Sequence, residues 1–222
     1  MARRRRGAGP RAGVRPCGPM PAEVVAFVRA ALPPPPARVL ELGAGAGHLA
    51  ATLSAAGYDV LAIDPASETE TVVRVAVADV DAPAGSFDAA VAVVSLHHVD
   101  PLPESCRRLA ELVRPGGRLV IDEFDIGAFD ERAARWLNEE RADVCGHVKD
   151  PAAMVAELRG HLHSVARLGE ALAPYFRLGE PVRGAYLHRW SVPSELRATE
   201  EDLIAAGRLP ATGARLIGTR RR

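Results

Sequence analysis

The sequence predicts an α/β fold with a doubly wound, mostly parallel sheet. Apolar segments of strand length alternate along the chain with segments of helical periodicity. A glycine-rich loop joins the first strand to the helix after it, as in nucleotide-binding α/β proteins. The 222 residues are 48% hydrophobic, which suffices for the core of one such domain.

The first strand and its loop are the stretch 38–50, RVLELGAGAGHLA, in which Gly43, Gly45 and Gly47 open a helix. Such a loop holds a nucleotide-like cofactor, or is a strand-to-helix turn with no ligand. Glu41 separates two classes of ligand, because a carboxylate there repels the pyrophosphate of a dinucleotide and attracts the ammonium and sulfonium of S-adenosylmethionine. His48 also stands where a third dinucleotide glycine would fall.

The ELGAGAG stretch resembles the first motif of the class I S-adenosylmethionine-dependent methyltransferases. Three further stretches are similar to that family: ADVDAPAGSFDAAVAVV, the L-H-H after it, and LVRPGGRLVI. The L-H-H is similar to small-molecule members such as the ubiquinone and menaquinone biosynthesis methyltransferases. The resemblance implies a Rossmann-like, seven-stranded sheet with an antiparallel C-terminal strand, S-adenosylmethionine as cofactor, and methyl transfer by direct displacement.

The predicted cofactor site lies at the carboxyl ends of the strands. Asp64, with Pro65 behind it, ends the second strand (58–63) and lies beside the ribose, or is simply a turn residue. The resemblance places Asp79 and Val80 at the adenine. The complete predicted set is Glu41, Gly43, Ala44, Gly45, Asp64, Pro65, Asp79, Val80 and Ser95.

His97 and His98 follow the buried strand 88–94 and are the predicted catalytic residues. One of them serves as the base for a hydroxyl or acidic-carbon acceptor, or both shape the cleft without proton transfer. Asp122, Glu123 and Asp125 end the fifth strand (118–122) and lie beside the acceptor, or cap the next helix. Their spacing does not suit a metal, and none is expected.

The remaining elements complete one domain, residues 20–222, with helix 21–32 as a lid over the cofactor cleft. Residues 1–19 are predicted to be a disordered arginine-rich tail, or an artefact if Met20 is the true start. The late aromatics between residues 175 and 190 wall an acceptor pocket or belong to the core. Expected strands are 72–78, 163–172 and 214–219, and expected helices are 49–56, 102–113, 129–140, 152–162 and 199–206.

Composition restricts the partners. The formal net charge is +0 and the pI is about 7.1, so nucleic acid and membranes are not expected as partners. A small-molecule substrate is expected instead. Three widely spaced cysteines and the lack of a signal or membrane segment predict a cytoplasmic protein with reduced thiols. Two alternatives stay open: an NAD(P)-dependent Rossmann oxidoreductase, and a methyltransferase-like binding domain without turnover. The sequence predicts no oligomeric state.

Overall fold

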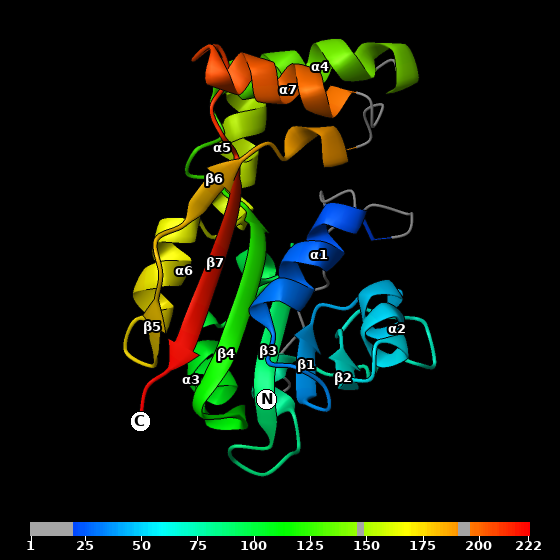
Figure 1. Cartoon of the computed structure of the whole chain (residues 1–222). Helices are drawn as coiled ribbons and strands as arrows, with labels where there is room; N and C mark the ends of the chain where they lie inside the picture. Colours follow the sequence, from blue (N-terminus) through cyan, green and yellow to red (C-terminus); the bar gives the residue numbers. More distant parts are fainter. Residues whose placement is uncertain (1–19, 146–148, 191–195) are drawn as a thin grey trace, which may run out of the picture.

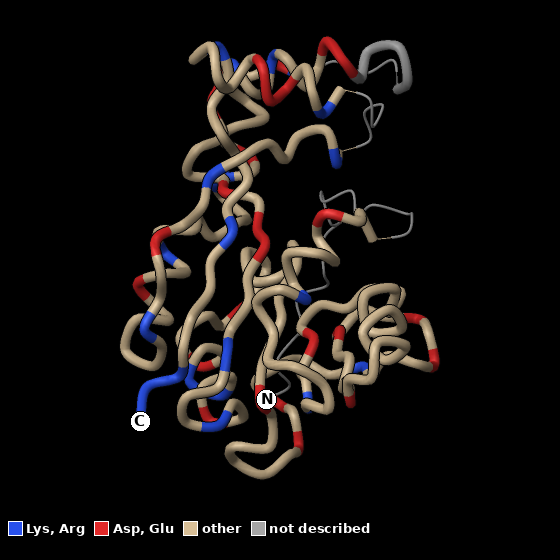
Figure 2. Tube along the Cα trace, viewed as in Figure 1, with Lys and Arg blue, Asp and Glu red and all other residues tan. Residues whose placement is uncertain are grey.

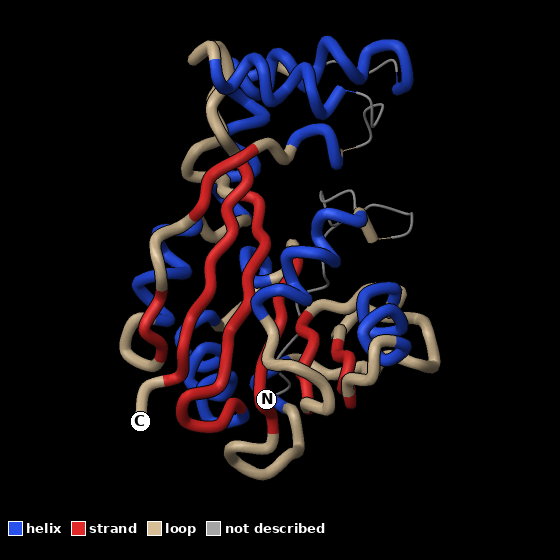
Figure 3. The backbone as a smooth tube through the Cα atoms, viewed as in Figure 1, coloured by secondary structure: helices blue, strands red, loops and turns tan. Residues whose placement is uncertain are grey.

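A computed structural model describes residues 20–145, 149–190 and 196–222, so the predicted tail 1–19 lies outside the described residues. Its centre is a seven-stranded sheet with the order β2-β1-β3-β4-β7-β5, in which β6 also pairs with β7 (Figures 1 and 3). The predicted fold class is confirmed. The four parallel strands are β1 (Arg38–Leu42), β2 (Asp59–Ile63), β3 (Phe87–Val93) and β4 (Val113–Phe124). The antiparallel edge is β7 (Gly213–Arg220) with β5 (Phe176–Leu178) and β6 (Val182–Gly184).

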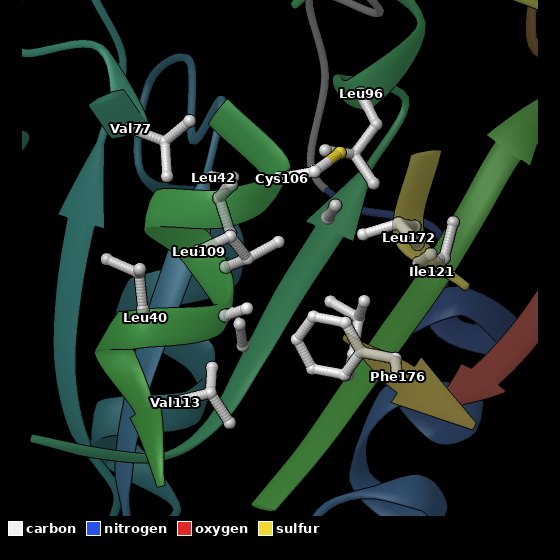
Figure 4. Close-up of a cluster of buried hydrophobic side chains, with 14 of the residues drawn as sticks. Leu40, Leu42, Val77, Leu96, Cys106, Leu109, Val113, Ile121, Leu172 and Phe176 are labelled. Atoms are coloured by element: carbon white, nitrogen blue, oxygen red, sulfur yellow. The ribbon is translucent and has the colours of Figure 1, made fainter. Parts of the chain in front are cut away.

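Helices cover both faces of the sheet because alternate strand residues are apolar on each side. One face carries α1 (Ala22–Ala31) and α2 (His48–Ala55), whose apolar residues pack on Val39, Val91 and Val120. The other carries α3 (Leu102–Leu112) and α6 (Val165–Leu172), and Figure 4 shows this larger cluster, in which Cys106 is buried. Whether α1 acts as a lid stays a prediction.

A separate helical layer stands beyond the carboxyl end of β4 (Figure 1). It consists of α4 (Glu131–Cys145), α5 (Pro151–His161) and α7 (Leu196–Ala205). Its core joins these helices to Phe124 and to the short helix η3 (Leu187–Arg189). No helix in the described part of the chain is long and apolar enough to cross a membrane.

The predicted strand 72–78 is wrong. In this segment only an isolated bridge between Val73 and Ile63 extends the sheet, and Val77–Asp79 forms the short helix η1. The alternating pattern was misleading because Val73 is 51% exposed at the sheet edge, whereas Val77 turns inward to the core. The segment therefore buries too little on its two faces to form a full strand.

The predicted strand 163–172 is also wrong, since its residues form α6. Val165, Leu168 and Leu172 are buried at helical spacing. The Ser164 side chain caps the helix by accepting from the Arg167 N–H. The short strands β5 and β6, which the sequence did not predict, bring the sheet to seven. The last strand was predicted correctly, and it pairs antiparallel with β4.

Candidate functional site

The strand order reverses between β1 and β3, and the glycine loop lies at this switch point. Crevices form at the carboxyl ends of parallel strands where the order reverses. Gly43 has φ +66°, and a Cβ built there would lie 2.4 Å from Ser95 Cβ at the end of β3. The loop backbone therefore runs directly against Ser95, and only glycine allows this approach.

Residues at the end of β2 hold the glycine loop by hydrogen bonds. The Ala44 N–H donates to the Ile63 carbonyl at 3.0 Å, and the Gly45 N–H donates to Asp64 Oδ2 at 3.0 Å. Asp64 Oδ1 accepts from the Ala66 N–H at 2.8 Å, and the residue is fully buried. The structure thus brings Asp64 to the loop but uses both of its oxygens on backbone amides, while its neighbour Pro65 is exposed. Its ribose contact stays a prediction.

Glu41 is buried on the α2 side of β1, with only 3% of the residue exposed. Burial raises the pKa of Glu41 to about 8, although the Ala50 N–H partly opposes this shift. Oε2 has no hydrogen-bond partner. A buried carboxyl with an unused oxygen beside a glycine loop is suited to a cationic ligand, whose charge would favour ionisation.

Asp79 and Val80 lie after β2, on η1 and just beyond it. Val80 is buried in the same cluster as Leu42 and Ile63, which end β1 and β2, whereas Asp79 is exposed. Arg108 of α3 holds this segment by donating to the Val80 carbonyl at 2.7 Å and to the Ala82 carbonyl at 2.8 Å. The segment thus lies near the strand ends, and its adenine contact stays a prediction.

The chain leaves β3 through a strained turn. Val94 has φ +51°, which is rare for a β-branched residue and costs about 1–3 kcal/mol. The turn leads into the short helix η2 (Leu96–His98), where the N–H groups of Ser95 and Leu96 donate to Glu123 Oε1 at 2.8 and 2.6 Å. The Ser95 hydroxyl oxygen is buried without a partner.

His97 and Glu123 form a buried pair, with 3% and 0% of the residues exposed. His97 Nδ1 is hydrogen-bonded to Glu123 Oε2. Because a carboxylate only accepts, Nδ1 carries the proton and Nε2 is left as the basic nitrogen. His98 is exposed, with its ring centroid 4.2 Å from that of His97.

The three acids at the end of β4 point to different partners. Asp122 accepts from Arg189 at 2.7 Å and from Arg215 at 2.8 Å. Asp125 pairs with Arg183 and accepts from the Val165 N–H, so it caps α6. The three acids therefore form no single cluster, and they do not cap the next helix together. Of the three, Glu123 is the one that is hydrogen-bonded to a predicted catalytic histidine, His97.

A second turn repeats the arrangement around His97. Glu200 of α7 accepts from the N–H groups of Tyr186, Leu187 and His188 at 2.8 to 2.9 Å, and from His188 Nδ1 at 2.8 Å. Burial alone would raise the pKa of Glu200, but these hydrogen bonds hold it below its usual value. Glu200 therefore fixes η3 as Glu123 fixes η2.

Aromatic residues join the two turns. The Phe124 ring lies 6.4 Å from His97, 5.3 Å from Tyr186 and 4.5 Å from Trp190, measured between ring centroids. Phe124 and Tyr186 are buried, and Trp190 is half-buried. Phe176, by contrast, belongs to the main core. Tyr186 belongs to the core of the helical layer and Trp190 packs against it, so the core alternative applies to these aromatics, and an acceptor-pocket wall stays a prediction.

Sequence reasoning missed the roles of Glu123, Glu200 and Arg189. A signal was present for Glu123, since an acid inside the apolar run LVIDEF needs a buried partner. Among the described residues, no three histidine, cysteine or acidic side chains gather as metal ligands would. The absence of a metal stays a prediction.

The fold and the glycine loop are typical of α/β proteins that bind a nucleotide-like cofactor at the switch point of the sheet. A family model described as a methyltransferase domain matches residues 19–158. The chain belongs to this methyltransferase family, and the family predicted from ELGAGAG is confirmed. The family match also confirms the predicted cofactor, S-adenosylmethionine. The NAD(P)-dependent oxidoreductase alternative is set aside.

Curated relatives match about half of this chain. An uncharacterized methyltransferase of Mycobacterium tuberculosis is 40% identical over 133 residues, covering 54% of this chain and 51% of the relative. A ubiquinone biosynthesis O-methyltransferase of Xanthomonas axonopodis pv. citri is 35% identical over 114 residues, covering 45% and 48%. The chain thus matches about half the length of these relatives.

Solved structures share the fold. A putative S-adenosylmethionine dependent methyltransferase from Listeria monocytogenes has a TM-score of 0.57 at 14% identity, covering 90% of this chain and 99% of that one. A 1,6-didemethyltoxoflavin-N1-methyltransferase from Burkholderia thailandensis, solved with S-adenosylhomocysteine, has a TM-score of 0.53 at 21% identity, covering 90% and 78%.

Three features of this chain fit S-adenosylmethionine. Gly43 lets the loop backbone run against Ser95 where a Cβ would collide, and two buried oxygens, Glu41 Oε2 and Ser95 Oγ, have no hydrogen-bond partner. These groups offer a carboxylate to an ammonium and a hydroxyl to a polar ligand atom, and nothing in the set favours a diphosphate.

Proposed function

We propose that this protein methylates a hydroxyl group of a small-molecule acceptor, with His97 as the general base and Glu123 as its positioning residue. The observation that carries the proposal is the buried Glu123–His97 pair, in which Nδ1 donates to the carboxylate and Nε2 is the basic nitrogen. A hydroxyl is a weak nucleophile until it loses its proton, and a positioned base accelerates such a step about 10²- to 10⁴-fold.

Glu41, the loop 43–45 and Ser95 hold S-adenosylmethionine in this proposal, with Asp64, Asp79 and Val80 toward its nucleoside. When bound, the cofactor supplies an electrophilic methyl group on a sulfonium. His97 Nε2 would accept the proton of the acceptor hydroxyl, so that the acceptor oxygen could receive the methyl group that the cofactor would supply. Alignment of the two reactants in a dry cleft supplies much of the acceleration.

Other groups near the pair are less suited to take the proton. Burial raises the pKa of the Tyr186 phenol above its ordinary value, so it stays protonated and does not act as a base at neutral pH. His98 is exposed, where a proton exchanges with solvent. Trp190, which packs on Phe124, gives the acceptor an apolar surface.

A cytoplasmic location and a small-molecule acceptor, without nucleic-acid or membrane partners, belong to the same proposal. The zero formal net charge and the free, buried Cys106 support it.

The test compares His97→Ala, Glu123→Gln and the neighbouring control His98→Ala. Each protein is incubated with S-adenosylmethionine and a panel of phenols, anilines and thiols, and S-adenosylhomocysteine formation is followed against pH. We expect His97→Ala to lower kcat about 10²- to 10⁴-fold and to remove the acidic limb of the profile. Glu123→Gln should lower kcat and displace that limb, and His98→Ala should leave both unchanged.

Two results contradict the proposal. One is a pH profile in His97→Ala that matches the wild-type protein. The other is tight S-adenosylhomocysteine binding without turnover on the whole panel, which favours the binding domain considered from the sequence.

A further inference from the structure

The first turn of α1 carries an acid, Glu23, that meets arginines from three other elements. Its Oε1 lies 3.4 Å from Arg197 Nη1 of α7 and 3.8 Å from Arg189 Nη2 of η3. From the sheet, Arg215 Nη2 of β7 donates to the Glu23 carbonyl at 3.5 Å. In Figure 2 an acidic position marks the start of α1, and basic positions mark η3 and the start of α7 above it. The start of α1 is thus connected to elements that are distant in sequence.

The charge of Glu23 completes a balanced group. Asp122 of β4 accepts from Arg189 at 2.7 Å and from Arg215 at 2.8 Å, so it alone leaves one of the two arginines without a counter-charge. Glu23 supplies the second negative charge beside them. Only 9% of the Arg189 side chain and 3% of the Asp122 side chain are exposed, so water screens this end of the group weakly.

The position of α1 itself is set by the sheet. Val24 and Val28 on its apolar face are fully buried in the cluster that contains Val39 and Val91 of the strands. Moving the helix away would expose this apolar surface to water. The helix therefore offers a fixed support to the elements that its first turn contacts.

The helical layer, by contrast, has a core of its own. Its cluster, which includes Phe124 and Tyr186, shares no residue with the cluster under α1. The ion pairs of Glu23 cross the boundary between the two clusters, and 27% of the Glu23 side chain and 44% of the Arg197 side chain are exposed. Ion pairs of partly exposed side chains are weak, so a boundary held in this way can open.

We propose that Glu23 is a positioning residue for acceptor binding, which holds η3, and Trp190 with it, in place against the sheet half of the protein. It acts through Arg189 and Arg197 and touches no reacting atom. Without its charge, η3 and α7 would separate from α1 more often, and the surface of Trp190 would be less well defined. The contact of Trp190 with the acceptor rests on the proposed function, whereas the ionic contact between α1 and the helical layer does not.

The first experiment measures the distance between α1 and α7 and needs no ligand. Spin labels are attached to cysteines introduced as Ala26→Cys on α1 and Ala205→Cys on α7, two exposed positions outside the ion pairs. Cys17 and Cys145 are replaced by serine, whereas the buried Cys106 is kept. Pulsed electron resonance of the full chain then gives the distribution of distances between the two helices.

The variant is Glu23→Gln, and the matched control is Glu157→Gln. Glu157 of α5 belongs to the helical layer, its side chain is 40% exposed, and it pairs with Lys149 at 2.9 Å. At about 50 mM salt we expect Glu23→Gln to increase the population with longer distances about threefold to tenfold, and Glu157→Gln to leave the distribution unchanged. At about 0.5 M salt the wild-type distribution should approach that of Glu23→Gln, since salt screens the ion pairs.

Turnover gives a second measurement, with the phenol that the unlabelled wild-type protein methylates fastest. We expect Glu23→Gln to raise the KM for this phenol about threefold to tenfold and to change kcat less than about twofold. The reason is that Glu123 of β4 holds His97 independently of α1 and α7. A lower kcat with an unchanged KM contradicts a positioning role in acceptor binding.

The same distance distribution in the wild-type protein and in Glu23→Gln overturns the proposal, and so does an equal change in Glu157→Gln. If Glu23→Gln fails to fold, Arg197→Gln takes its place, and a distribution equal to that of the wild-type protein is then the contrary result. If the wild-type protein methylates nothing on the panel, the proposed function fails, and the distance measurement still decides whether Glu23 holds the helical layer to α1.

Discussion

Replacing Glu41 with Gln should stabilise the ligand-free protein, and by more at high pH than at low pH. The carboxyl is buried, its pKa is raised from 4.5 to about 8, and one oxygen is unpaired. The folded state therefore holds the proton that the unfolded chain releases above pH 4.5. The Gln side chain has no charge to bury, and its carbonyl still accepts the Ala50 N–H.

The magnitude follows from proton linkage. A raised pKa in the folded state favours folding fully below the unfolded pKa, and this contribution is lost as the pH rises toward 8. At pH 7 the wild-type protein must take up nearly one proton on folding, which costs about 3 kcal/mol. Relaxation around the charge lowers this figure, so it is an upper value. Near pH 4.5 the two proteins should differ little.

The assay is urea unfolding of both proteins at pH 5 and pH 7.5, followed by circular dichroism. We expect the difference in the free energy of unfolding to grow by about 1–3 kcal/mol between the two pH values, with m-values unchanged. A difference that is the same at both pH values, or a variant less stable at pH 7.5, refutes the reasoning.

Ligand binding tests the protonation state of Glu41 in a second, independent way. A bound ammonium favours the ionised carboxylate, so S-adenosylhomocysteine should release close to one proton from the wild-type protein at pH 7. Calorimetry in buffers of different ionisation enthalpy measures this number. The Glu41→Gln variant should release none and should bind more weakly.

Three further predictions concern other contacts. Gly43→Ala should abolish S-adenosylhomocysteine binding because its Cβ meets Ser95, whereas Gly116→Ala, with φ +78° and no atom within 4 Å, should cost only about 1 kcal/mol of stability by chemical denaturation. Glu200→Gln should destabilise the protein by about 1–3 kcal/mol, most at pH above the usual carboxyl pKa, because the ionised form is the one that accepts four hydrogen bonds. Arg108→Met should free two carbonyls and raise the calorimetric Kd for S-adenosylhomocysteine several-fold while leaving kcat unchanged.

The cofactor half of the fold could be predicted because its signals are local. A buried strand followed by Gly43, Gly45 and Gly47 specifies the turn through backbone conformation alone, and the positive φ of each glycine agrees. The positions of Asp64 and Ser95 then follow from where parallel strands end.

The acceptor half could not be predicted in the same way. Glu123 acts through His97, 26 residues before it, and Glu200 acts through His188, so each role exists only once the chain has folded. The segment 163–172 was misjudged because its helix is fixed by Asp125, forty residues upstream, as well as by its own pattern. The strand periodicity of 72–78 likewise could not show that this segment lies at the exposed edge of the sheet, where Val73 is left open to solvent.

The turns at η2 and η3 are each held by a glutamate, and the two glutamates come from different parts of the fold. Glu123, on the central sheet, holds the segment that carries His97, the proposed general base, whereas Glu200, on a peripheral helix, holds the segment that carries Arg189 and Trp190. In the proposed mechanism, exchange of residues on α7 would thus change the surface offered to the acceptor while His97 and Glu123 keep their places. Such a layout lets a lineage acquire new acceptors without rebuilding its chemistry.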